Sequence, residues 1–101
     1  MSVLVITTVS ADVSVFEKVM SENADTLRGI SDEARAKGAS RHLFADDGAG
    51  HILIVDEWDS RESFDAFFST QPDIGKMMAE VGVTAPPSTV SYRVIESADR
   101  F

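Results

Sequence analysis

The chain has 101 residues, the size of one domain, so we expect a single domain over residues 1–101. Seventeen acidic residues outnumber nine basic ones, and this net charge of −8 disfavours binding to nucleic acid or to an anionic membrane surface, since both need clustered Lys and Arg. The chain has no cysteine, which excludes disulfides, thiolate catalysis and cysteine-ligated metals.

The N-terminal sequence Met-Ser-Val-Leu-Val-Ile has neither the basic region nor the cleavage site of a signal peptide. Its apolar run is also too short to cross a bilayer. We therefore expect a cytoplasmic protein.

The first third of the chain predicts a strand followed by one long helix. Val3–Val9 is an apolar, β-branched run typical of a strand. Apolar residues then recur at three- and four-residue steps, from a capping box at Ser14–Glu17 to about Lys37, and Gly38 follows in the usual stop position. Gly29 is the point at which we expect this helix to bend or split.

Two further strands, Ala39–Asp46 and Ile52–Trp58, are separated by a turn rich in Asp and Gly. The spacing predicts a β-hairpin. The paired aspartates of the turn, Asp46 and Asp47, are explained by turn chemistry rather than by metal binding, because no correctly spaced third and fourth ligand follows. We therefore predict no metal site.

The last part of the chain predicts two short helices and a final strand. Asp59 or Ser60 is expected to cap a helix whose apolar face consists of Phe64, Phe67 and Phe68. A second helix begins near Asp73 and ends at Gly82, and Ser88–Glu96 alternates as a strand.

The predicted order βαββαβ indicates an α+β, ferredoxin-like fold with a four-stranded antiparallel sheet. Right-handed crossovers place the helices on one face of that sheet. The first and third strands are nevertheless apolar on both faces, with Leu4 and Ile6 opposite the valines of the first strand. We therefore predict a homodimer in which two sheets pack face to face.

The passage Asp56-Glu57-Trp58-Asp59-Ser60-Arg61-Glu62-Ser63-Phe64-Asp65-Ala66-Phe67 resembles the strand-to-helix segment of the dimeric α+β barrel superfamily, within it the antibiotic biosynthesis monooxygenase-like proteins. The resemblance implies an apolar pocket between helices and sheet. It also implies oxidation of a small aromatic or polyketide-like substrate without metal or flavin, the substrate carbanion itself reacting with oxygen. We accordingly expect no cofactor.

The chain departs from the resembled family at informative positions. Phe67 stands where many members carry a histidine on the second helix. The haem-degrading branch is similar at Trp58, but it needs an asparagine on the first strand and a histidine ligand that residues 73–80 lack. Haem degradation is therefore disfavoured.

Trp58, His42 and Tyr92 are the candidate catalytic residues. The indole N–H of Trp58 can donate to a developing oxyanion, although a plain core tryptophan explains it equally well. His42 can act as a base if its strand face lines the pocket, against a surface or interface role, whereas His51 is expected at the surface. Tyr92 can donate a proton.

The candidate substrate-binding residues belong to different predicted elements, and each has a structural alternative. Asn23 is either a polar residue at the core edge or a hydrogen-bonding group in the pocket, and Met77 is either core or pocket wall. Arg93 either holds an anionic group or forms an ion pair across the dimer. The complete set is Asn23, Phe64, Phe67, Met77 and Arg93.

Two functions of different classes remain open. The first is a cofactor-independent monooxygenase-like enzyme. The second is a non-catalytic homodimer that binds a small apolar ligand or serves in a stress response, which the scarcity of titratable residues favours.

Overall fold

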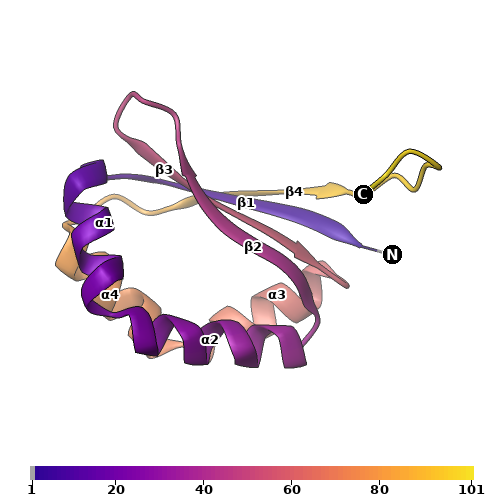
Figure 1. The fold of residues 1–101 in the computed structure, drawn as a ribbon, viewed down its shortest axis with the longest axis horizontal. Helices are drawn as coiled ribbons and strands as arrows, with labels where there is room; N and C mark the ends of the chain where they lie inside the picture. The colour runs from indigo at the N-terminus through magenta and orange to yellow at the C-terminus, as the bar shows by residue number, and fades with distance from the viewer. Residues whose placement is uncertain (1) are drawn as a thin grey trace.

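A computed structural model describes residues 2–101, which form one antiparallel sheet covered on a single face by helices (Figure 1). The α+β, ferredoxin-like architecture predicted from the sequence is confirmed. Within the described residues the elements are β1 (Val3–Ser10), α1 (Val13–Glu22), α2 (Ala24–Ala36), β2 (Ala39–Asp46), β3 (His51–Trp58), α3 (Arg61–Phe68), α4 (Pro72–Val81) and β4 (Ser88–Arg93).

The strands lie in the order β2-β3-β1-β4, so β3 and β1 are central in the part of the sheet that the structure describes. Asp56 of β3 is paired with His42 of β2 and with Val5 of β1, and residues paired across antiparallel strands share a sheet face. This row is on the side of the sheet that the helices cover, because Val5 and Asp56 are buried. The register therefore decides which side chains can reach the space beneath the helices.

The core between sheet and helices consists of two clusters of buried residues. One contains Val9, Phe16, Val19, Ile52, Met77 and Val81. The other is built around the aromatic end of β3 and contains Val5, Trp58, Phe64 and Phe67. Ile30 of α2 packs against both clusters, so this helix spans the length of the core.

The predicted long helix is interrupted, and the predicted position of the interruption is wrong. The break falls at Asn23, whose φ of −111° and ψ of 24° are not helical. The side-chain Nδ2 of Asn23 donates to the Val19 carbonyl at 2.8 Å, which is the local competition with the backbone that Asn offers. Gly29 lies inside an unbroken α2.

Of the three helix starts predicted from the sequence, two have a different cap residue in the structure. Asp12, rather than the Ser14 capping box, accepts the Val15 N–H at 3.1 Å and begins α1. Ser60 caps α3 as one of the two predicted candidates, its Oγ accepting the Ser63 N–H at 3.1 Å. Helix α4 begins with Pro72 in its first turn, before the predicted cap residue Asp73.

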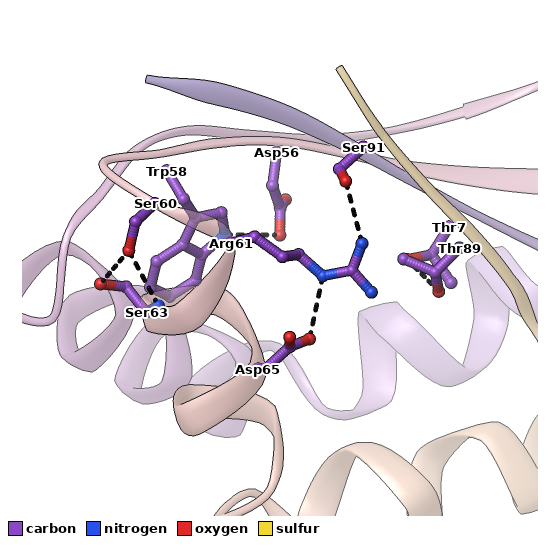
Figure 2. Close-up of polar contacts among 9 residues, drawn as sticks. All are labelled: Thr7, Asp56, Trp58, Ser60, Arg61, Ser63, Asp65, Thr89 and Ser91. Atoms are coloured by element: carbon purple, nitrogen blue, oxygen red, sulfur yellow. Dashed lines mark hydrogen bonds and ion pairs between the residues drawn. The ribbon is translucent and has the colours of Figure 1, made fainter. Parts of the chain in front are cut away.

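Arg61 connects the first turn of α3 to the edge of the sheet by hydrogen bonds. Its Nε donates to Asp65 at 3.0 Å, and its Nη1 donates to the hydroxyl of Ser91 on β4 at 3.0 Å (Figure 2). The guanidinium also lies 5.5 Å from the centre of the Phe64 ring. These contacts connect the start of α3 to the edge strand β4.

The sheet face opposite the helices is apolar and partly exposed. Leu43, Val90 and Tyr92 are 43%, 46% and 53% exposed on it, and Ile6 is paired with Val90 at its centre. The final strand ends at Arg93, earlier than the predicted Glu96, because its neighbour β1 begins at the residue paired with Arg93. No helix within residues 2–101 is both long and apolar enough to cross a membrane.

Candidate functional site

A cavity of about 460 Å³ lies between the helices and the β2–β3 half of the sheet. Its volume falls in the range of sites for drug-sized molecules. Residues of α2, α4 and β3 supply most of the apolar wall, and α3 closes one end with Phe67 and Phe68. The principal apolar contributors are Leu27, Ile30, Ile54, Phe67, Met77 and Met78.

A hydrogen-bonded group of three side chains lies at the sheet wall of this cavity. Asp56 is 3% exposed, and its Oδ1 lies 2.6 Å from Nδ1 of His42. Its Oδ2 accepts the indole N–H of Trp58 at 3.2 Å (Figure 2). All three residues line the cavity.

The arrangement follows directly from strand geometry. Trp58 and Asp56 are two positions apart on β3, which puts both on the helix side of the sheet. His42 is the residue of β2 paired with Asp56. The hairpin therefore brings together an imidazole and a carboxylate that lie 14 positions apart in the sequence.

The pair of His42 and Asp56 can act on a proton. When Nδ1–H donates to the carboxylate, Nε2 carries the lone pair and can accept a proton, and the carboxylate then stabilises the imidazolium. The His42 side chain is 39% exposed, whereas Asp56 is screened behind it. Only the imidazole is thus presented to a molecule entering from solvent.

Trp58 has a different environment from the one predicted for an oxyanion donor. It is 1% exposed and packs against three phenylalanine rings of α3, with centroid distances of 5.3–6.4 Å to Phe64, Phe67 and Phe68. Its N–H is already bonded to Asp56. The indole holds the carboxylate in place and gives the cavity part of its wall.

The structure brings some predicted site residues together and separates others. Phe67 and Met77 line the cavity, and Phe64 packs behind Trp58 without lining it. Asn23 lies at the junction of α1 and α2, beside a separate shallow depression. Tyr92 and Arg93 do not line the cavity, and Tyr92 is on the opposite face of the sheet, paired with Leu4.

Asp56 is the site residue that the sequence prediction missed. The alternation of β3 places it beside Trp58, and the register of the hairpin opposes it to His42. Both signals are present in the sequence.

Three charged groups outside the cavity, Asp47, Asp99 and Arg100, have shifted pKa values. The backbone N–H of Ala49 and contacts from His51 lower the pKa of Asp47 in the β2–β3 turn, as expected for turn aspartates. Ion pairing with Glu57, and then with Glu96, raises the pKa of Arg100. The Glu57 pair anchors the C-terminal segment on the sheet face that the helices leave open.

Solved structures share this fold over nearly the whole chain. A dimeric ferredoxin-like protein from an uncultured marine organism superposes with a TM-score of 0.71 at 14% identity, covering 99% of this chain and 93% of its own. Rv0793 from Mycobacterium tuberculosis gives 0.61 at 18% identity, covering 98% and 100%. An antibiotic biosynthesis monooxygenase gives 0.62 at 14% identity, covering 93% and 99%.

At these identities the likeness concerns the fold, and the resemblance predicted from the Asp56–Phe67 segment is confirmed at that level. No family model matches the chain, and no curated protein sequence matches it.

Proposed function

We propose that the chain is a cofactor-independent monooxygenase-like enzyme that oxidises a small aromatic or polyketide-like molecule in the cavity beneath its helices. The observation that carries the proposal is the contact of 2.6 Å between His42 and the buried Asp56 at the wall of an otherwise apolar cavity. A buried carboxylate behind an imidazole is the arrangement by which a histidine is oriented as a base.

In the proposed reaction His42 removes a proton from an acidic CH₂ group flanked by aromatic rings. The resulting carbanion transfers electrons to O₂, and the peroxide formed at that carbon loses water to leave a carbonyl group. One oxygen atom enters the substrate and the other leaves as water that contains both hydrogens of the CH₂ group, so the substrate itself supplies all four electrons that reduce O₂. The apolar wall favours this course because the flat aromatic part of the substrate is removed from water on binding.

One observation favours the alternative of a non-catalytic binding protein. The indole N–H of Trp58, the expected donor to an oxyanion, is bonded to Asp56. A protein that only binds an apolar ligand needs no such donor. The cavity serves both functions, so activity has to be measured directly.

We also propose that two copies of the chain pack through the sheet face that the helices leave uncovered. The exposed apolar residues Leu43, Val90 and Tyr92 of that face support this arrangement. A neighbour of the same fold is described as dimeric.

Oxygen consumption with a panel of anthrones and quinols tests the proposed reaction. We expect His42→Gln to lower kcat by roughly 10²–10⁴-fold, the usual contribution of a general base. The matched control is His51→Gln, since His51 lies in the β2–β3 turn and does not line the cavity. It should leave kcat unchanged.

Uptake of oxygen that survives His42→Gln would refute the role of the base. Saturable binding of the same anthrones and quinols without oxygen uptake by the unmodified protein would identify the binding alternative instead.

A further inference from the structure

The cavity has arginines along one side, although the chain as a whole is acidic. Three of the nine basic residues line it, namely Arg28, Arg35 and Arg41, but Arg41 is paired with Glu57 and therefore has its side chain on the opposite face of the sheet. Among the described lining residues Asp56 alone is acidic, and its carboxylate is occupied by His42 and Trp58. A protein of net charge −8 therefore presents a locally positive rim at this cavity.

The two arginines whose side chains can face the cavity both belong to α2. Arg28 and Arg35 are seven positions, or about two turns, apart on α2, with Ser31 between them on the same side of the helix. The apolar residues Ile54, Phe67 and Met77 line the inner wall.

The guanidinium groups are available to a ligand. Arg35 forms no ion pair with any residue in the range 2–101. Arg28 lies 2.6 Å from Asp25, but the Asp25 side chain is fully exposed and that of Arg28 is 73% exposed. Such a solvated pair is weak and is easily displaced by an incoming anion.

We infer that the molecule this cavity accepts is an amphipathic acid: an aromatic or polyketide-like body carrying one carboxylate or similar anionic group. The body occupies the apolar interior and the anion lies at the rim, where arginine binds carboxylates by charge-assisted hydrogen bonds. This inference rests on the proposed function only in placing the ligand in the same cavity. It adds the charge that the ligand must carry.

A pair of fluorescent dyes that differ in one acidic group tests the inference. Anilinonaphthalene sulfonate is anionic, and N-phenylnaphthylamine is the same molecule without the sulfonate. We expect Arg28→Gln combined with Arg35→Gln to weaken binding of the sulfonate about tenfold and to leave the neutral dye unchanged. Raising the salt concentration should weaken only the sulfonate, and only in the unmodified protein.

The matched control is Lys18→Gln combined with Lys76→Gln, which removes the same charge from residues that do not line the cavity. It should leave the affinity for the sulfonate within about twofold, because exposed charges that do not contact the ligand are weakened by solvent and salt. Equal affinities of the unmodified protein and the arginine variant for the sulfonate would overturn the inference. So would an equal loss with both dyes.

The two proposals can fail separately. His42→Gln should bind the sulfonate dye like the unmodified protein, because it leaves the arginines in place. Absence of oxygen uptake together with arginine-dependent dye binding would refute the enzyme and keep the acidic ligand. Oxygen uptake together with dye binding that does not depend on the arginines would keep the enzyme and refute the acidic ligand.

Discussion

Asp56 is the residue on which the candidate site depends. It is nearly inaccessible to water, and its two oxygens accept hydrogen bonds from different elements, one from His42 on β2 and one from the indole of Trp58. A buried carboxylate is costly unless such partners are present. Each partner therefore stabilises both the fold and the geometry of the imidazole.

Replacing Trp58 by Phe should reveal this double role. The substitution removes the N–H that Asp56 accepts and leaves unfilled volume beside Phe67. We expect a loss of about 2–4 kcal/mol in the free energy of unfolding, from one unsatisfied carboxylate oxygen and a small cavity. Urea denaturation followed by circular dichroism measures it.

Val15→Ala is the control for that measurement, because it shortens a side chain that is 40% exposed on α1, away from the open face of the sheet. Its effect should stay within about 0.5 kcal/mol. A Trp58→Phe variant as stable as the unmodified protein would show that the indole hydrogen bond contributes nothing to folding.

At the scale of elements, the strands and helices were predictable and their ends were not. The alternation of apolar residues in strands and their helical spacing reflect which residues are buried, and the fold as a whole determines that burial. The break at Asn23 and the cap at Asp12 depend instead on single hydrogen bonds to nearby backbone atoms. Ser14 and Gly29 were equally plausible from composition, so the sequence pattern could not decide between these positions.

Substitution by alanine should change the stability of the protein in opposite directions at Gly38 and at Gly29. Gly38 has a φ of +122°, and a Cβ there would lie 2.6 Å from the Asp59 carboxylate, so Gly38→Ala should destabilise the protein by about 1–3 kcal/mol. Gly29 lies within α2, and a Cβ added there would meet no atom within 4 Å, so Gly29→Ala should stabilise it by about 0.5–1 kcal/mol. Thermal unfolding of the two variants measures both signs.

The two substitutions control for each other, since each adds one methyl group: Gly29→Ala inside α2 and Gly38→Ala just after its C-terminal end. A stabilising Gly38→Ala would mean that the tight approach of Asp59 to the end of α2 is absent in solution.

At the scale of the whole molecule, the open face of the sheet decides the assembly. Ile6 is at its centre, paired with Val55 of β3 and Val90 of β4. We expect Ile6→Lys to convert a dimer into single chains of 11.0 kDa, because a charge would be buried at the middle of the interface. Sedimentation velocity at micromolar concentration measures the change.

Val15→Lys is the matched control, because Val15 is 40% exposed on α1, on the helical side of the molecule. It should leave the sedimentation coefficient unaltered. An unmodified protein that sediments as one chain would refute the proposed pairing of sheets.

The position of the arginine rim has a kinetic consequence for such an assembly. The cavity lies under the helices, whereas the proposed contact between copies uses the reverse side of the sheet. Ligands can therefore bind to and leave the cavity while the two protomers stay associated. The dissociation rate of a bound ligand should accordingly be the same at any protein concentration that keeps the dimer intact. Each protomer should bind ligand independently of the other.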